Sequence, residues 1–268
     1  MSFMKPLIKR QLEMGDLIKM KLEVLPPTTL KLFEKFKEHE SLIRQLRLNE
    51  TLCLVGGTAL ALQIGHRRSN DLDFACFDNT LPGYAIDQFL AAIQPSHYIK
   101  QINSIAQTSQ FKIQTGLNLN DYVRDFTIDD VKVTFFILGM TYEQKEFYRK
   151  TAKHNNLWVL PMMGVEGIQM AKTLVLKNRV RSRDMYDLMV LMRDHDYSFV
   201  DFINNFSQFL ATDDLEYFKA ILTGKIPLDR DDEGLLPVNV EVSVDEIYKF
   251  FKVKFREYEL WIANQLLK

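Results

Sequence analysis

Residues 51–74, TLCLVGGTALALQIGHRRSNDLDF, constrain the fold more than any other stretch of the chain. An apolar run ends at Gly56 and Gly57, and an apolar helical pattern follows directly. A second apolar stretch then begins at Asp71 and Asp73. This order predicts a strand, a tight turn, a short helix and a strand beside the first, because a helix of about 10 residues can carry the chain back to an adjacent strand.

The two acidic residues and the two glycines suggest a common chemistry. Side chains alternate along a strand, so Asp71 and Asp73 should point to the same face. Neighbouring carboxylates repel each other unless a cation lies between them. A glycine turn at a helix N-terminus exposes backbone N–H groups to phosphate oxygens. We therefore predict a Mg²⁺ site at the acids beside a phosphate-binding turn at Gly56 and Gly57; the alternatives are a solvated strand end and a purely structural turn.

Three polar residues precede the acids. Ser69 either completes a turn or hydrogen-bonds a phosphate two residues before Asp71. Arg67 and Arg68 are either surface charges or phosphate contacts, and only one of the two can face the site.

Composition and charge describe an ordinary soluble globular protein of one large or two small domains. Of the 268 residues, 47% are hydrophobic and 26% are charged. A formal net charge of −1 gives no overall basic field for nucleic acids, although a local basic patch stays possible. Cys53 and Cys76 lie in apolar runs, which favours reduced structural thiols in a cytoplasmic protein over a disulfide or a metal site. The first 16 residues lack the apolar core of a signal peptide, and no apolar run approaches the ~20 residues of a membrane span.

Apolar spacing and turn residues predict the remaining elements. Helices are expected over 7–22, 28–48 and 85–93, and a β-hairpin is expected from strands 122–128 and 131–138 joined at Asp129-Asp130. The second of these strands, VKVTFFIL, looks buried on both faces. Further helices are expected over 164–180, 182–195, 197–210, 213–222 and 243–267, with Ser182 and Ser243 as N-caps.

The pattern GGTALAL…GHRRSNDLDF resembles the signature of the nucleotidyltransferase superfamily with a polymerase-β-like core. It is more closely similar to the AbiEii/AbiGii toxin group, whose relatives include the MenT toxins of mycobacteria. That group adds an Arg-Ser ahead of the acids, a downstream Lys on a helix and an Arg-Asp-x-x-Asp element. This chain matches them with Arg68-Ser69, Lys172 and Arg183-Asp184-Met185-Tyr186-Asp187, so that the resemblance covers about residues 54–191.

The resemblance implies an α+β fold, with a nucleotidyltransferase-like mixed β-sheet core, flanking helices and a C-terminal helical bundle. Residues 1–160 would form the core with its N-terminal helices, and residues 161–268 a helical domain that completes the active-site cleft.

The resemblance also implies roles for the matching residues. Asp71 and Asp73 would hold Mg²⁺, Lys172 would neutralise triphosphate charge, and Asp184 would be the essential downstream acid, with Asp187 as a second candidate. The nucleotide would be bound by Gly56, Gly57, Thr58, Arg68, Ser69, Lys172 and Asp187. From the residues alone, the preferred interpretation is that Lys172 is a solvated helix residue and that Asp184 merely favours a helix N-terminus.

One position departs from the pattern. Many enzymes of this superfamily place a third carboxylate on a later central strand, where this chain has Thr134. Asp130 shares the face of Thr134 but lies about 13 Å away along a strand, too far to substitute without a bulge. The attacking hydroxyl would then need another base, or the reaction would rely on positioning and metal alone.

We predict a Mg²⁺-dependent nucleotidyltransferase that transfers a nucleoside monophosphate from an NTP to a hydroxyl acceptor and releases pyrophosphate. The resemblance implies tRNA as acceptor and a toxin with a cognate antitoxin protein as partner. A basic cluster beside the predicted site either holds RNA phosphates or is an exposed helix end: Lys172, Lys177, Arg179, Arg181 and Arg183. The alternatives are a small-molecule nucleotidyltransferase of the antibiotic-modifying kind and a degenerate nucleotide-binding protein.

Overall fold

The computed structural model describes residues 20–154, 158–210 and 214–267. Most of the helix predicted over residues 7–22 lies outside these ranges; Leu22–Val24 forms a single 3₁₀ turn.

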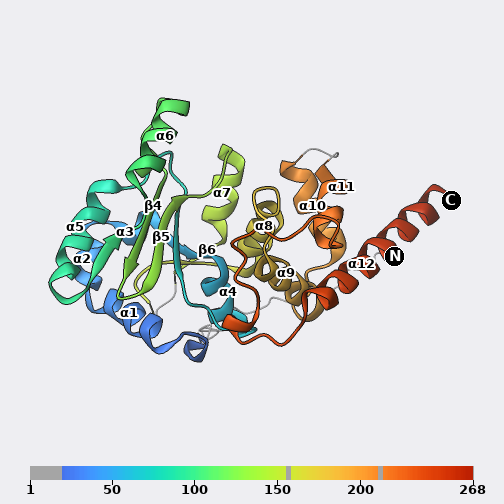
Figure 1. Cartoon of the computed structure of the whole chain (residues 1–268), viewed down its shortest axis with the longest axis horizontal. Helices are drawn as coiled ribbons and strands as arrows, with labels where there is room; N and C mark the ends of the chain where they lie inside the picture. Colours follow the sequence, from blue (N-terminus) through green and yellow to red (C-terminus); the bar gives the residue numbers. More distant parts are fainter. Residues whose placement is uncertain (1–19, 155–157, 211–213, 268) are drawn as a thin grey trace, which may run out of the picture.

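A seven-stranded mixed sheet forms the centre of the first half of the chain (Figure 1). Its strand order is β3-β4-β5-β2-β1-β7-β6. The strands are β1 (Leu52–Val55), β2 (Leu72–Cys76), β3 (Ile99–Gln101), β4 (Val123–Ile128), β5 (Val131–Ile137), β6 (Ala152–Lys153) and β7 (Met162–Met163).

The predicted strand–turn–helix–strand unit is confirmed. β1 leads directly into the nine-residue helix α4 (Gly56–Ile64), and the chain returns as β2, which pairs antiparallel with β1. Val55 lies opposite Asp73 in this register, so the end of β1 and the start of β2 meet at one edge of the sheet. The glycine turn therefore lies next to the acidic residues.

The predicted hairpin of β4 and β5 is also confirmed. Asp129 and Asp130 form its turn with φ of 48° and 66°, the left-handed conformation that tight hairpin turns require. The prediction that β5 is buried on both faces was wrong. Val133 is buried whereas Lys132 is exposed and Thr134 is half-buried, so only one face of the strand is covered.

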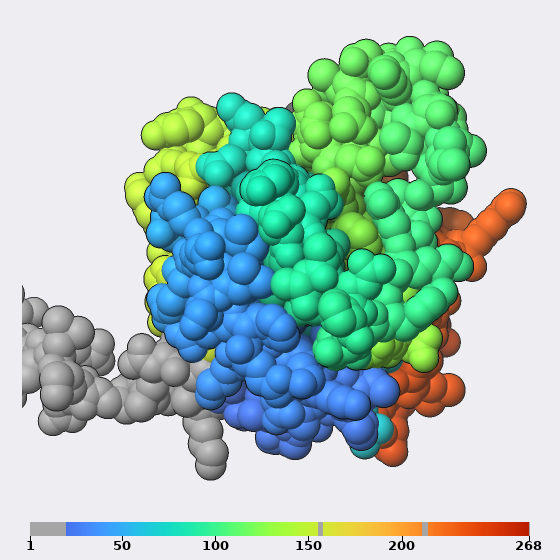
Figure 2. Space-filling view, turned by 90° about the vertical axis from the view of Figure 1, so that its left-hand side faces the viewer, coloured from blue at the N-terminus to red at the C-terminus, as the bar shows by residue number. Residues whose placement is uncertain are grey.

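The covered face packs against N-terminal helices. The single helix predicted over 28–48 is instead three: α1 (Pro27–Glu38), α2 (Glu40–Gln45) and α3 (Leu48–Thr51). Arg47 adopts a left-handed φ of 56° and separates the last two. Phe36 of α1 stacks on Phe74 of β2 at 5.2 Å between ring centroids. These helices lie beside α5 (Gly83–Ile93) on one side of the molecule (Figure 2).

Two helices have no counterpart in the sequence-based prediction: α6 (Ile105–Thr115) and α7 (Tyr142–Thr151). α6 begins with a capping box between Ser104 and Gln107 but buries no residue, and Ile105 and Ile113 are exposed. It stands out from the body of the molecule (Figures 1 and 2). Without a buried face it carries no helical periodicity, which explains why the sequence pattern did not reveal it.

The second half of the chain is helical, as predicted, and α8 lies against α4 (Figure 1). Ser243 caps the last helix through a capping box with Glu246, as predicted. The N-cap prediction for Ser182 was wrong, because Ser182 is the first helical residue and its hydroxyl donates to Asp232. The helices are α8 (Val165–Val175), α9 (Ser182–Asp194), α10 (Phe199–Phe209), α11 (Asp214–Leu222) and α12 (Val244–Leu266).

Three further predictions concern the chain as a whole. Cys53 and Cys76 are buried and free, as predicted. None of the helices in the described ranges is long and apolar enough to cross a membrane. The division into two domains at residue 160 stays a prediction; β7, just beyond it, pairs with β1 through Leu54 and Met162.

Candidate active site

The glycine turn allows two side chains to approach the backbone. Gly56 has a φ of +70°, and a Cβ atom there would lie 2.8 Å from Asp73 Oδ2. A Cβ atom on Gly57 would lie 2.2 Å from Arg67 Nη2. A side chain at Gly56 would be strained by the positive φ and would displace the Asp73 carboxylate, and a side chain at Gly57 would displace the Arg67 guanidinium.

Asp73 lies in β2 and Asp71 directly precedes this strand, near enough for its charge to act on Asp73. Burial raises the pKa of both, and repulsion by Asp71 helps to raise that of Asp73 to about 6. Carboxylate oxygens that are partly desolvated are suited to a hard divalent cation. The donor chemistry of this pair therefore fits Mg²⁺.

A short polar chain holds the segment ahead of the acids. The Thr58 hydroxyl donates to the backbone oxygen of Asp71 and lies 2.7 Å from Ser69 Oγ. Thr58 and Ser69 are both buried. These contacts fix the segment before β2 to the first turn of α4.

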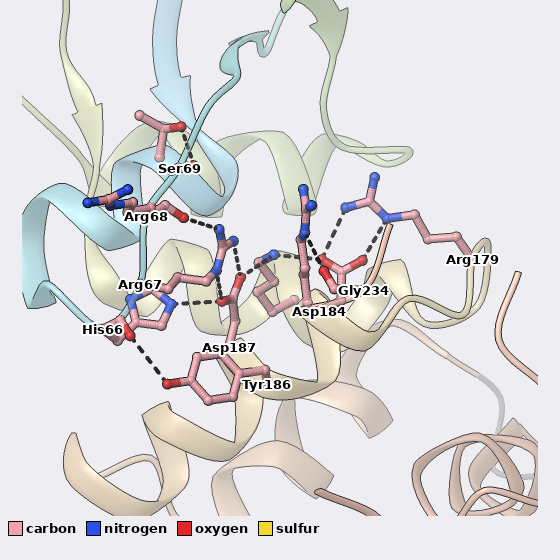
Figure 3. A network of polar contacts seen from close by, with 12 residues as sticks. His66, Arg67, Arg68, Ser69, Arg179, Asp184, Tyr186, Asp187 and Gly234 are labelled. Atoms are coloured by element: carbon pink, nitrogen blue, oxygen red, sulfur yellow. Dashed lines mark hydrogen bonds and ion pairs between the residues drawn. The ribbon is translucent and has the colours of Figure 1, made fainter. Parts of the chain in front are cut away.

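A buried ion pair lies behind the glycine turn (Figure 3). Asp187 of α9 accepts from Arg67 at 2.6 and 3.0 Å, and its Oδ2 lies 2.6 Å from Lys172 Nζ of α8. His66 Nε2 lies 2.7 Å from Asp187 Oδ1. Burial alone would raise the pKa of Asp187, but Arg67 and Lys172 outweigh it and hold that pKa well below its usual value. Asp187 is therefore a fixed negative charge that joins residues from three segments.

Asp184 extends this arrangement by one helical turn. Lys172 Nζ donates to its Oδ1 at 2.6 Å, and Arg179 Nε donates to its Oδ2 at 2.7 Å (Figure 3). We call the six residues the buried ion network: His66, Arg67, Lys172, Arg179, Asp184 and Asp187. Arg179 and Lys172 lie near enough to Asp73 to oppose the rise of its pKa. The network therefore places positive charge beside the acidic pair.

The structure brings most of the predicted site residues together in one connected region. Gly56, Gly57, Thr58, Ser69, Asp71 and Asp73 surround the start of β2, and Lys172, Asp184 and Asp187 form part of the buried ion network. Arg68 lies apart, because its side chain is exposed, whereas Arg67 is buried and faces the network. The functional roles of these residues remain predictions.

The other members of the basic cluster are neutralised. Arg179 contacts Asp184, while Lys177 lies 3.0 Å from Asp214 and Arg183 lies 2.7 Å from Glu233. Arg181 contacts Asp231. Because each cation faces a carboxylate, these residues form no uncompensated basic groove.

Among the network residues, His66 was not considered from the sequence, whereas Arg67 and Arg179 were considered only as possible phosphate contacts. One signal was available for them. Asp184 and Asp187 share one face of α9 at i and i+3, and buried acids at such a spacing require cations nearby.

Paired carboxylates beside a glycine turn, backed by lysine and arginine, form an arrangement that can stabilise charge on phosphoryl groups. The profile of the family described as "Nucleotidyl transferase AbiEii toxin, Type IV TA system" matches residues 41–259. The chain belongs to this family of nucleotidyltransferase toxins, and its resemblance to that family in sequence is confirmed. It is 25% identical over 205 residues to an uncharacterized protein of Aquifex aeolicus (strain VF5), with 76% of this chain and 86% of the relative covered.

The solved structures that resemble the chain include one from Helicobacter pylori and one from Mycobacterium tuberculosis. JHP933 from Helicobacter pylori is 19% identical, with 88% of this chain and 99% of the other covered and a TM-score of 0.44. MenT4, a nucleotidyltransferase toxin from Mycobacterium tuberculosis H37Rv, is 11% identical, with 85% and 86% covered and a TM-score of 0.42.

We expect Gly56→Ala to be more damaging than a matched glycine substitution. Gly116 also has a positive φ, of +75°, but no atom lies within 4 Å of the position of its Cβ. Gly116→Ala should therefore cost only about 1 kcal/mol of unfolding free energy from backbone strain. Gly56→Ala should cost roughly 1–3 kcal/mol more, because its methyl group meets Asp73. Urea denaturation of both variants measures the difference, and equal costs would contradict the close approach.

Removing Asp187 should destabilise the fold strongly. Asp187→Ala leaves Arg67 and Lys172 buried without their shared counter-charge, which should cost roughly 3–5 kcal/mol. Asp231→Ala is the control, because its partner Arg181 is partly exposed and the expected cost is below about 1 kcal/mol. Thermal or urea denaturation gives both values. A small cost at Asp187 would show that the network does not support the fold.

Because the pKa of Asp73 is raised, we predict that Asp73→Asn increases the folding stability of the metal-free protein by an amount that depends on pH. Between the ordinary pKa of Asp and about 6, folded wild type binds more protons than unfolded wild type. Its stability therefore falls as pH rises through this window, and the neutral variant escapes the loss. We expect the variant to be more stable by on the order of 2 kcal/mol at about pH 8, with the gain disappearing near about pH 4. A pH-independent difference in denaturation experiments would contradict the shift.

Proposed function

We propose that this toxin-family enzyme transfers a nucleoside monophosphate from an NTP to a hydroxyl acceptor, with Mg²⁺ held by Asp71 and Asp73. The observation that carries the proposal is the close approach of the Asp73 carboxylate to the Gly56 turn, with Asp71 two residues before it. Within the described ranges no group of three or more His, Cys, Asp or Glu side chains is arranged to hold a metal ion. The remaining ligands would come from nucleotide phosphates and water.

When bound, Mg²⁺ would stabilise negative charge on the phosphates during displacement of pyrophosphate. The chain's own groups would orient the nucleotide. The first turn of α4 offers backbone N–H groups to phosphate oxygens at the positive end of the helix. Thr58 and Ser69 would fix this turn relative to β2 through their mutual contact. Arg68, which is exposed, would reach a nucleotide from the solvent side.

Lys172 would act as the electrostatic partner of the triphosphate. It already lowers the pKa of Asp73, so its charge is felt at the acidic pair. Its ammonium group contacts Asp184 and Asp187 and has a third N–H to offer. Asp184 would hold both Lys172 and Arg179 in place, and Asp187 would do the same for Arg67. The essential downstream acid would thus act by positioning cations.

We further propose that the acceptor is the 3′ end of a tRNA and that a cognate antitoxin protein restrains the enzyme in the cytoplasm. Membership of a family described as a toxin of a TA system supports the antitoxin, whereas the tRNA acceptor rests on the resemblance in sequence to the toxin group. The basic cluster adds little support for RNA, because its cations face carboxylates. Residues 161–268 would serve as a helical domain that closes the active-site cleft over the core.

Two alternatives lead to different outcomes in one experiment. A small-molecule nucleotidyltransferase would ignore RNA, and a degenerate protein would bind nucleotide without transferring it. Thr134, where many relatives in the superfamily place a third carboxylate, motivates the degenerate alternative.

The experiment incubates purified protein with each α-³²P-labelled NTP, Mg²⁺ and total RNA. We expect label on tRNA, its loss with EDTA, and its loss in Asp71→Ala/Asp73→Ala. The matched control is Asp129→Ala/Asp130→Ala, which also removes two acids but at the hairpin turn. Circular dichroism verifies that both variants fold. Full activity of the Asp71/Asp73 variant would disprove the assignment, and label on no RNA would favour an alternative.

A further inference from the structure

Asp125 of β4 lies on the face of the sheet that carries the acidic pair. Thr134 of β5 is opposite Asp73 of β2 on one side and opposite Asp125 of β4 on the other. Residues directly opposite each other in neighbouring strands point to the same face. The three side chains therefore form one row across the sheet, on the face opposite Phe74 and its helices.

A hydrogen bond brings the Asp125 carboxylate to the position of the missing third acid. Thr134 Oγ1 donates to Asp125 Oδ1 at 2.9 Å. Asn103 holds Asp125 from the other side, because its Nδ2 donates to Asp125 Oδ2 at 3.0 Å and its Oδ1 accepts from the Asp125 backbone N–H at 2.6 Å. Asp125 and Thr134 are half-buried, so the pair is both fixed and reachable.

We propose that Thr134 binds the attacking hydroxyl of the acceptor and that Asp125 takes its proton through Thr134. This inference rests on the proposed function. The Thr134 hydroxyl already donates its hydrogen bond to Asp125, so its lone pairs can accept a hydrogen bond from the acceptor hydroxyl. A hydroxyl is a weak base alone but becomes effective beside a carboxylate that can receive its proton. Thr134 and Asp125 together would supply the general base that the Thr134 hydroxyl alone cannot provide.

The step balances in protons and electrons. The acceptor O–H proton passes to Thr134 Oγ1 while the Thr134 proton passes to Asp125 Oδ1. The acceptor oxygen forms a bond to the α-phosphorus, and the bond from that phosphorus to the oxygen bridging to the β-phosphate breaks. Pyrophosphate leaves with that electron pair. Asp125 is then neutral and returns its proton to water.

Asp130 cannot take this role. It lies in the hairpin turn, is exposed and has a left-handed φ of 66°. Asp125 is instead in register with Thr134 and in contact with it. Asp125 acts through another residue and is therefore a positioning residue, whereas Thr134 would touch the acceptor. A purely structural alternative is that Asp125 only anchors the loop of Asn103.

The test measures kcat and KM for NTP in four variants. Asp125→Asn keeps the shape of the side chain but cannot accept a proton, and we expect kcat to fall about 10²-fold with KM for NTP unchanged. Thr134→Val should cause a similar loss, whereas Thr134→Ser should retain most activity. Asp130→Asn is the matched control, with the same chemical change in the same hairpin, and should behave as wild type.

A rescue separates the relay from a structural role. Thr134→Asp in the Asp125→Asn background places a carboxylate at the position nearest Asp73, and kcat should recover at least tenfold. A merely structural Asp125 predicts no recovery. Unchanged kcat in both Asp125→Asn and Thr134→Val, while Asp71→Ala/Asp73→Ala is inactive, would overturn the relay and leave the proposed function intact. Absence of transfer by wild type would remove both.

Discussion

The ion pair of Asp187 with Arg67 and Lys172 is the interaction on which the site depends. Arg67 follows the helix that leads from the glycine turn, and Lys172 and Asp187 belong to two helices of the second half of the chain. One buried carboxylate therefore joins the sheet region to the helical region. Burying these charges is costly unless each is paired, so that the geometry of both halves is fixed together. The same contacts bring Arg67 against Gly57, behind the first turn of α4.

The electrostatics of the region divide into two parts. In the buried ion network three cations face two carboxylates, and the remaining positive charge lies next to Asp71 and Asp73. The acidic pair is left with repulsion that burial strengthens, and so it has raised pKa values. If the proposed cation and phosphates bind here, they would relieve this repulsion, so that the site would be more favourable when filled than when empty. The repulsion between Asp71 and Asp73 lowers the stability of the fold, and the ion pairs around Asp187 raise it.

Local patterns predicted the parts of the fold that depend on local chemistry. The apolar runs and glycines predicted the strand–turn–helix–strand unit, and the turn residues Asp129-Asp130 placed the hairpin. The pairing of Asp187 with Arg67 spans 120 residues of sequence, and no local rule selects Arg67 over its neighbour Arg68. Asp125 escaped notice for a related reason, because its relation to Thr134 appears only once the register of two strands is known. Helix α6 lacks the buried face that would have made it visible.

The left-handed backbone of the turn at Asp129 and Asp130 limits which sequence changes the hairpin can accept. Only two residues, both with left-handed backbone, join the strands. The length of the turn therefore helps to fix the register that places Asp125 opposite Thr134. Inserting a single residue there would rotate β4 by one pleat and direct Phe126 toward the polar row, with Asp125 toward the apolar helices. The turn should therefore accept residues that readily adopt left-handed backbone, such as Asn and Gly, but not a change in length. In this hairpin, loop length is as strictly determined as a catalytic side chain.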